Sequence, residues 1–584
     1  MKLILKIFTV IAVASIVSVS GCKKVLDEEP RDRLTKEFFS TADGIEGGVA
    51  AGYSDLRNQW GVENFMNMFC GGTDEVLAGG SNNNQHWFTY APIITSRTEE
   101  TGIAWNTWYE IINTMNGVLQ FGPDADMDAG KKAQLMAQAL FLRAFCYYHL
   151  VTTFGDVPLH LEFVTESSSA DSRAPIAEVY TQVVKDLTDA AAALPNQPAA
   201  NTGKPAFKAT ALYLLAKTYL ARGWSSAAAP TDFTNAYNTA KSVIDAKATY
   251  GLDLWPNFGD VNRKGNEYGR ETLMVIDHNA DTKYGEYTLN TAASGPKENK
   301  SNFYFRPNYP TVTANYPAAG GNPVCIRDIA NGRPFIRIRP NYNYTMLVAF
   351  PVAGRATDYR YDRTFQTHWM SNVSGVVTPR GTLVPGVDTA IWMPDRLVTP
   401  AERAAFKGII FEPPIPGATT PYTSVIYPSM RKYDDSTRPN LNDASTRPYI
   451  LFKFSELYLI AAEAAFKSND KANAAAMINV LRRRAAARPG QSTAEYNNAL
   501  AAQTITANDV TLDFILDERS RELWGESLRW WDLVRTQTLV TRVKQFNTEA
   551  AANVKAEFML KPIPLTSQID RVTEGPKFPQ NPGY

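Results

Sequence analysis

The chain has 584 residues, of which 44% are hydrophobic and 20% charged, the composition of an ordinary globular protein with material for one large core or several small ones. Its 59 basic residues balance its 59 acidic ones, so charge gives no reason to expect nucleic acid or an acidic lipid surface as a partner. We therefore expect a globular protein that does not bind nucleic acid.

The first 21 residues have the features of a lipoprotein signal peptide. Two lysines precede an apolar run at 7–19, which is too short to span a bilayer comfortably. The sequence VSGC at positions 19–22 matches a bacterial lipobox, in which cleavage leaves a cysteine for lipid attachment. We predict attachment at Cys22, stable anchoring by several acyl chains, and a polar tether at 22–34. An ordinary signal peptide that happens to meet a cysteine is the simpler alternative.

Helical periodicity is strong between the tether and residue 250. It predicts helices at 35–56, 102–120, 131–153, 175–194, 207–222 and 232–246, with a loop region at 71–97. Gly155 and Pro158 are expected to end the third of these helices. The run ALYLLAKTYLARG followed by FTNAYNTAKSVID resembles a tetratricopeptide repeat unit. We assign residues 35–250 to an N-terminal helical part.

From 251 to 448 the periodicity fades, and Pro, Gly, Asn, Tyr and Arg become dense, as in NFYFRPNYP and DYRYDRTFQTHW. This composition predicts loops with short strands, where backbone is exposed for recognition. The region is too long for a linker and too aromatic to be disordered. Arg337 and Arg339 alternate with isoleucines in one expected strand, so they share a face that is either a solvated edge or a polar wall for an anionic sugar.

Helices return at 449–467, 471–487 and 511–536, within a C-terminal part at 449–584. The stretch 517–535, DERSRELWGESLRWWDLVR, is the densest in charge and has apolar residues on one helical face. Its opposite charges recur at i,i+3 or i,i+4, at Asp517–Arg521, Glu526–Arg529, Arg529–Asp532 and Asp532–Arg535. We expect one scaffold helix held by a structural network of charges. Residues 22–584 are expected to form one folded body, because helices from both ends enclose the irregular middle.

The chain resembles the SusD/RagB lipoproteins, the surface nutrient-binding partners of TonB-dependent transporters in Bacteroidetes. The likeness is carried, in the family's order, by the lipobox, LDEEPRDRLTKEFFSTADGIEGGVAAGYSDLR, QALFLRAFCYYHLVTTFGDVPL, YILFKFSELYLIAAEAA, ERSRELWGESLRWWDLVR, and LKPIPLTSQID with terminal QNPGY. The resemblance implies a mostly α-helical SusD-like fold, with tetratricopeptide-like helical pairs as scaffold and a loop-rich ligand-binding region with short strands. It implies an outer-membrane protein, lipid-anchored and facing the cell exterior, that binds glycans or peptides without cleaving them and caps a SusC-like barrel.

No catalytic constellation is visible in the sequence. The five histidines form no HExxH or other close metal pair, and GxSxG, P-loop and GxGxxG motifs are absent. Besides Cys22, the cysteines are Cys70, Cys146 and Cys325, which form no CxxC motif and leave at least one thiol unpaired. We expect no enzyme, no disulfide framework and no metal or cofactor, although the acidic pair Asp434-Asp435 would allow a structural calcium ion that nothing else supports.

Sugar binding needs aromatic rings for the apolar face of a pyranose and short polar side chains for its hydroxyls. The loop SNNNQHW supplies both, and family members resemble this arrangement in the loop after the first helix. The irregular middle supplies further tyrosines and tryptophans, of which we expect two or three to reach the ligand, with Tyr342 and Trp392 also considered. The candidate ligand-binding residues are Asn83, Asn84, His86, Trp87, Tyr284, Tyr287, Tyr304, Tyr309 and Trp369.

The favoured hypothesis is a surface lipoprotein that captures an oligo- or polysaccharide and delivers it to a SusC-like TonB-dependent transporter. A peptide-binding lid of the same type of transporter is the first alternative, and an anchored glycoside hydrolase is the second, because a catalytic carboxylate pair is defined by spatial rather than sequence distance. The sequence does not name the ligand.

Overall fold

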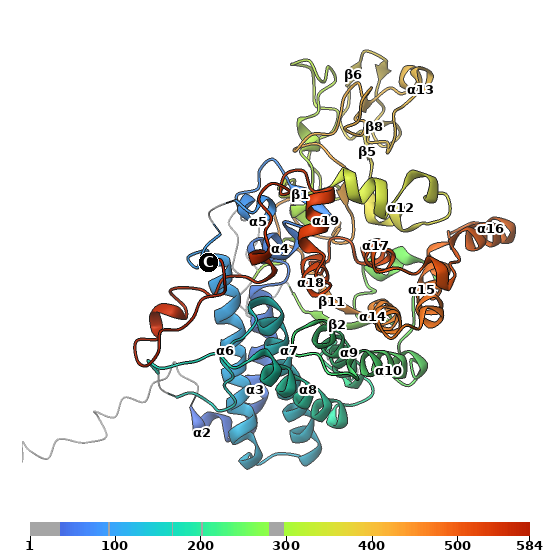
Figure 1. Cartoon of the computed structure of the whole chain (residues 1–584). Helices are drawn as coiled ribbons and strands as arrows, with labels where there is room; N and C mark the ends of the chain where they lie inside the picture. The colour runs from blue at the N-terminus through green and yellow to red at the C-terminus, as the bar shows by residue number, and fades with distance from the viewer. Residues whose placement is uncertain (1–34, 92–93, 166–167, 200–202, 280–296) are drawn as a thin grey trace, which may run out of the picture.

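The computed structural model describes residues 35–91, 94–165, 168–199, 203–279 and 297–584 (Figure 1). The fold is mostly helical, as predicted. The helices are α2 (Lys36–Phe39), α3 (Ala42–Asp55), α4 (Glu63–Cys70), α5 (Gln85–Thr89), α6 (Glu99–Phe121), α7 (Ala129–Phe154), α8 (Ile176–Ala193), α9 (Lys208–Trp224), α10 (Asp232–Asp245), α11 (Ser301–Tyr304), α12 (Arg360–Thr364), α13 (Pro400–Ala405), α14 (Phe454–Lys467), α15 (Lys471–Ala485), α16 (Thr493–Gln503), α17 (Leu512–Leu523), α18 (Arg529–Arg535) and α19 (Leu539–Phe546). A π-helical turn, η7, spans Tyr342–Ala349.

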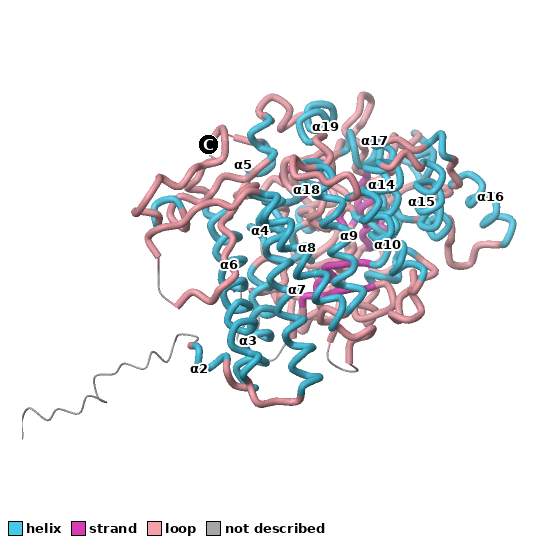
Figure 2. Tube along the Cα trace, turned by 60° about the horizontal axis from the view of Figure 1, so that its bottom comes forward, coloured by secondary structure: helices cyan, strands magenta, loops and turns pink. Residues whose placement is uncertain are grey.

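The scaffold is a row of helices in which each packs on the next, from α6 through α7, α8, α9 and α10 to α14 and α15 (Figures 1 and 2). α9 and α10 pack on each other, and both carry small buried residues, among them Ala209, Ala216 and Ala240, whose size permits close packing of helices. Gly155, at φ 77°, ends α7 where the sequence predicted a stop. The predicted helical pairs are therefore present.

The strands are short. They are β1 (Val76–Ala78), β2 (Thr272–Ile276), β3 (Ile338–Pro340), β4 (Phe365–Gln366), β5 (His368–Met370), β6 (Val377–Thr378), β7 (Gly381–Thr382), β8 (Thr389–Trp392), β9 (Ile409–Ile410), β10 (Ser429–Met430) and β11 (Tyr449–Lys453). The antiparallel pair β1–β3 joins the N-terminal part to the middle of the chain, and β2–β11 joins the middle to the C-terminal part. The pair β4–β10 joins two segments of the middle.

The helix predicted at 449–467 begins as a strand. Residues 449–453 form β11, paired with the buried strand β2, and only Phe454–Lys467 is helical. Ile450 therefore belongs to the sheet rather than to the predicted helix. Pairing with a distant buried strand outweighs a helical pattern that is weak over its first five residues.

Part of the irregular middle folds as a small lobe with its own core. β8 lies between β5 and β9, and this sheet with the β6–β7 pair and α13 forms the projection at the top of Figure 1. Tyr309, Trp369, Ile391 and Phe411 are among its fully buried residues, separate from the main core, whose members extend from Phe39 to Phe578.

The single helix predicted at 517–535 is two helices. α17 ends at Leu523 and α18 begins at Arg529, because Gly525 (φ 75°) and Ser527 (φ 59°) adopt left-handed backbone that an α-helix cannot continue through. The predicted helix at 35–56 likewise divides, where the Thr41 side chain caps α3 by accepting from Gly44 N.

The predicted charge network exists, but most of its partners differ from the prediction. Asp532–Arg535 forms at 2.9 Å. Arg529 instead binds Asp74 at 2.7 Å, and Asp517 binds Arg542 at 2.6 Å. Asp74, Arg529, Asp532 and Arg542 are buried, whereas Asp517 and Arg535 are partly buried. The tertiary fold therefore supplies the partners that neutralise the charges of Arg529 and Asp517.

The three cysteines of the described residues, Cys70, Cys146 and Cys325, are buried free thiols. Within the described ranges, no helix is both long enough and apolar enough to cross a membrane.

Candidate ligand-binding cleft

The polar loop between β1 and α5 is held by its own amides. Asn82 is buried, and its Nδ2 donates to Asn67 Oδ1 at 3.2 Å and to Arg337 O at 2.7 Å. Asn84 Nδ2 donates to Glu100, which also lies 3.7 Å from His86 Nε2. Burial raises the pKa of Glu100, but the nearby His86, the backbone and the Asn84 amide outweigh it and leave the pKa below its usual value. These side-chain hydrogen bonds fix the conformation of the loop.

Of the candidates in this loop, Asn83 is exposed, Asn84 and His86 are half-buried, and Trp87 is 1% exposed. Lys561 places its ammonium 4.3 Å from the Trp87 ring and 4.2 Å from that of Trp530. Burial lowers the pKa of Lys561 well below its ordinary value. Trp87 is therefore packed inside the core and presents no free face for stacking in this structure.

Three candidates from the middle of the chain are also buried. Tyr304 donates its hydroxyl to Gly61 O at 3.1 Å, and Tyr309 donates to Gly332 O at 2.8 Å. Tyr309 stacks on Trp369 in the lobe core, with ring centroids 6.2 Å apart. Their positions give these rings a packing role, and ligand contact by them stays a prediction. Tyr284, Tyr287 and the predicted lipid-attachment residue Cys22 lie outside the described residues.

Partly exposed tyrosines occur instead in a cleft of about 170 Å³ between the main core and the lobe. Tyr342, from η7, packs on the main core, and Tyr422 packs on the lobe core, so the two rings come from opposite walls. Tyr422 donates its hydroxyl to Pro394 O. The other lining residues are Arg339, Pro340, Met346, Pro414, Thr423, Ser424, Tyr427 and Pro428.

The predicted polar loop and this cleft share an edge. Gly80 N donates to Ser424 O at 2.8 Å, and a Cβ built on Gly80 would lie 2.5 Å from a methyl group of Val425. The fold therefore brings together the two segments that the sequence proposed separately, the loop near 83 and the irregular middle. It does so at Ser424, which together with Tyr422 was not among the sequence candidates. The run PYTSVIYP has aromatic and hydroxyl residues between two prolines, and this composition is the sequence feature that could have identified the segment.

The two arginines that the sequence placed on one face have different roles. Arg337 donates from Nε to Glu63 at 2.6 Å and binds Ser81 O, so it fastens the polar loop. Arg339 lines the cleft, donates to Ala78 O at 2.9 Å and pairs with Glu549. Because each guanidinium has an acidic partner, this wall is polar without being strongly cationic.

The buried carboxylates of Glu518 and Glu522 do not have the properties of a catalytic pair. Glu518 is bound by Arg360, Arg482 and Arg521, and Glu522 by Arg484 and Arg360. Burial opposes ionisation, but the arginines outweigh it, lowering the pKa of Glu522 to about 2 and that of Glu518 further. A general acid needs a raised pKa, whereas these groups stay ionised and paired. Among the described residues no group of three His, Cys, Asp or Glu could hold a metal ion, and Asp434 and Asp435 bind Arg306 and Ser445.

Fold and cleft together define a helical scaffold protein with a tyrosine-bearing cleft on its irregular face. Two family models match the chain: the SusD family over residues 353–584, and a family described as starch-binding and associating with the outer membrane over residues 26–220. The SusD-like protein P2 of Formosa agariphila is 25% identical, over 99% of this chain and 100% of its own length. These matches, at both ends of the chain, and the full-length SusD-like relative support a protein of the SusD/RagB family.

Solved structures share the fold. A laminarin-binding SusD-like protein superposes with a TM-score of 0.66 at 20% identity, covering 93% of this chain and 100% of its own. Surface glycan-binding protein A of Bacteroides thetaiotaomicron, in complex with laminarihexaose, gives 0.62 at 19% identity, covering 93% and 99%. NanU of B. fragilis gives 0.64 at 18% identity, covering 94% and 98%.

Proposed function

We propose that this protein is a cell-surface lipoprotein that binds a glycan in the Tyr342–Tyr422 cleft and delivers it to a SusC-like TonB-dependent transporter. The observation that carries the proposal is the pair of partly exposed tyrosine rings facing one cleft from two walls. Pyranose rings stack on such aromatic faces, and the neighbouring Thr423, Ser424 and Arg339 supply hydrogen-bonding groups for sugar hydroxyls. The relatives that bind laminarin and laminarihexaose support a glycan as the ligand class.

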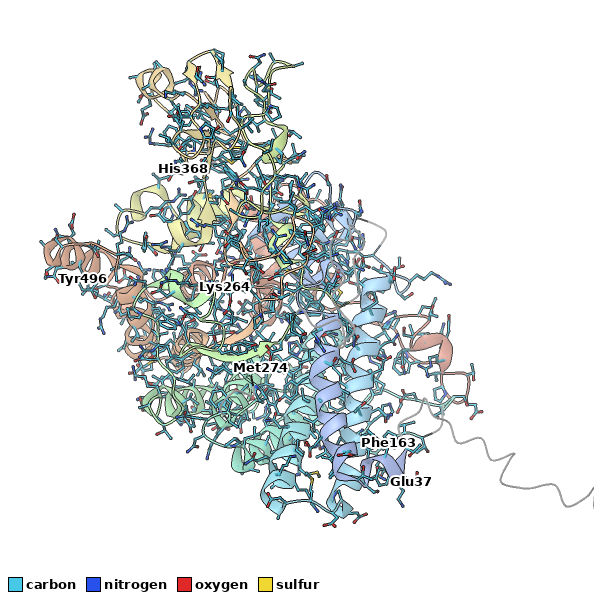
Figure 3. All side chains as sticks on the ribbon, turned by 180° about the vertical axis from the view of Figure 1, so that it is seen from behind. Glu37, Phe163, Lys264, Met274, His368 and Tyr496 are labelled. Carbon is cyan, nitrogen blue, oxygen red and sulfur yellow. The ribbon has the colours of Figure 1, made fainter. Side chains whose placement is uncertain are left out.

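The test is retention of the purified mature protein in native gels containing plant, host or microbial polysaccharides, followed by calorimetry on any that retard it. Tyr342→Ala and Tyr422→Ala are expected to abolish the retardation, because each removes one of the two partly exposed tyrosine rings on which a sugar would stack. Tyr496→Ala is the matched control, since this half-buried tyrosine lies on α16 at the edge of the molecule, away from the cleft (Figure 3). Failure to bind any polysaccharide in the panel would reject the glycan as ligand.

The same preparations separate the two alternatives. Affinity for oligopeptides without sugar binding would favour a peptide-binding lid. Release of reducing sugar, abolished by one carboxylate substitution, would establish a hydrolase and overturn a purely binding role.

Anchoring and delivery need their own experiments. Incorporation of labelled palmitate in cells, lost in Cys22→Ala, is the expected result for lipid attachment at Cys22, and surface accessibility to a protease in intact cells would give the orientation. Cross-linking in native outer membranes is expected to capture a large TonB-dependent receptor. Recovery of the protein without such a receptor would reject the delivery role and leave glycan binding standing.

A further inference from the structure

A second cavity, larger than the cleft and apart from it, lies among the scaffold helices. It measures about 450 Å³ and is bounded by α7, α8, α9, β11, α18 and the C-terminal segment at 559–582. Its mouth carries exposed residues, among them Ser226 and Gln537, whereas its floor is formed by buried aromatic rings. The volume is within the roughly 300–1,000 Å³ range of small-molecule sites.

Two tyrosine hydroxyls in this cavity are uncommitted. Tyr148 is 5% exposed and Tyr180 is 3% exposed, and both line the cavity. Neither hydroxyl has a hydrogen-bond partner among the residues that the structure describes. Neither oxygen is among the buried polar atoms that lack a partner, so both hydroxyls are accessible from the cavity and available to a bound molecule or to water.

His149 adds a third polar group to the floor. Its Nδ1 donates to Phe145 O at 2.8 Å, and burial lowers its pKa to about 3, so the ring is neutral. In a neutral imidazole whose Nδ1 carries the hydrogen, Nε2 is an acceptor. The cavity therefore offers hydroxyl donors and an imidazole acceptor together, a combination suited to ligand hydroxyl groups, which both donate and accept.

The walls are aromatic and the charges are balanced. The ring centroid of His149 lies 5.4 Å from that of Trp60 and 5.3 Å from that of Trp531. Trp224 and Phe452 also line the cavity. The cations near the floor each have acidic partners, in the pairs Lys217–Glu456, Arg519–Glu456, Arg519–Asp532, Arg535–Asp532 and Arg535–Glu463. Three cations face three carboxylates, so this network favours neither an anion nor a cation.

We infer that this cavity is a second binding site, separate from the cleft, for a neutral polyhydroxylated ligand of one or two sugar rings. The aromatic wall, of which Trp224 is the partly exposed indole, takes the apolar side of such a ring, while Tyr148, Tyr180 and the His149 acceptor take its hydroxyls. A volume of about 450 Å³ has room for one or two sugar rings. The inference does not rest on the cleft, because it uses none of the cleft's residues.

The test is calorimetry of the mature protein with glucose, galactose, mannose, maltose and cellobiose, with glucuronate as an anionic probe and benzyl alcohol as an apolar one. At least one neutral sugar is expected to bind, and Tyr148→Phe/Tyr180→Phe is expected to weaken it at least tenfold. The substitution removes only two oxygen atoms that have no partner, so the fold should persist, and the thermal midpoint verifies this. Ala221→Phe, which fills the cavity from α9, should abolish binding, whereas Tyr496→Phe should leave it unchanged.

Two results would overturn the inference. One is the absence of binding by every neutral sugar, or preferential binding of glucuronate or benzyl alcohol. The other is sugar binding that survives Ala221→Phe and is lost in Tyr422→Ala, which would place the ligand in the cleft. If Ala221→Phe fails to fold, tryptophan fluorescence replaces it, because tryptophans line the cavity and none lines the cleft. A fluorescence change on adding sugar to the wild type, reduced in the Tyr148→Phe/Tyr180→Phe variant, would place the sugar in the cavity.

Discussion

Arg529 donates from Nε and Nη2 to both carboxylate oxygens of Asp74, at 2.7 Å each. This fully buried pair links α18 to the segment just before β1, and so fixes the C-terminal helices against the polar loop that borders the cleft. Arg542 donates to the same aspartate at 2.7 Å. Asp74 therefore has two cationic partners, and burial of its charge depends on both.

Arg529→Ala is expected to lower the free energy of unfolding by about 3 kcal/mol or more, because breaking a buried pair leaves a charge without its main partner. The remaining Arg542 keeps the loss at the lower end of the range for such pairs. Urea denaturation followed by circular dichroism measures it. Arg483→Ala, at an exposed position on α15, is the control and should change stability by less than about 0.5 kcal/mol. A variant with unchanged stability and weakened glycan affinity would contradict the scaffold role of this pair.

Glu75, next to Asp74, should give the protein a pH-dependent stability. Burial raises its pKa to about 7, against 4.5 for an ordinary glutamate. Between these values the folded state binds more protons than the unfolded state, so the stability due to this group is fully present below about pH 4.5 and is lost as the pH rises through about 7.

Glu75→Gln keeps an uncharged side chain of similar shape at this position. Relative to wild type, the variant should gain stability as the pH rises from about 4.5 to about 7, by at most about 1.4 kcal/mol per pH unit. Above about pH 7 the difference in stability between the two proteins should stay constant. Urea midpoints of both proteins at a series of pH values measure the difference. Parallel curves for the two proteins would show that Glu75 is charged throughout.

The helical scaffold was readable from sequence because its signals are local. The apolar period of α7, its stop at Gly155 and the start of α8 after Pro175 each depend on residues that are close in sequence. β11 was missed because its partner β2 lies far away in sequence, and pairing between strands of the same chain leaves no local period. The break at Gly525 was missed because one glycine within a helical pattern does not reveal its φ.

The candidate site could be predicted only in part, because burial of its residues depends on contacts with distant parts of the chain. Composition identified a loop rich in amides and a region rich in tyrosine, but burial decides which rings a ligand can reach. Trp87 and Tyr309 are interior, whereas Tyr342 and the overlooked Tyr422 keep exposed surface. That difference depends on Lys561 and on the lobe core, which no local pattern near these residues encodes.

Trp87 and Tyr422 should therefore behave in opposite ways. Trp87→Ala is expected to cost about 3–5 kcal/mol of stability, because it empties a fully buried indole site, and to leave the glycan affinity of the folded fraction unchanged. Tyr422→Ala should cost less stability and abolish glycan retention. Thermal midpoints and affinity electrophoresis on both variants provide the comparison. Lost affinity in a Trp87→Ala protein that melts normally would return Trp87 to the ligand site.

Gly80→Ala should test the edge that joins the polar loop to the cleft. The added Cβ would lie 2.5 Å from Val425 Cγ1, so either the loop or the Tyr422 segment must move, which typically costs about 1–3 kcal/mol. Because Gly80 N donates to Ser424 O, movement here also displaces Ser424 from the cleft wall, and glycan affinity should fall severalfold. Gly354→Ala is the matched control, since its Cβ would meet only Pro351 Cγ at 3.7 Å. Calorimetry on the two variants measures the effect, and equal affinities would mean that the loop edge does not shape the ligand site.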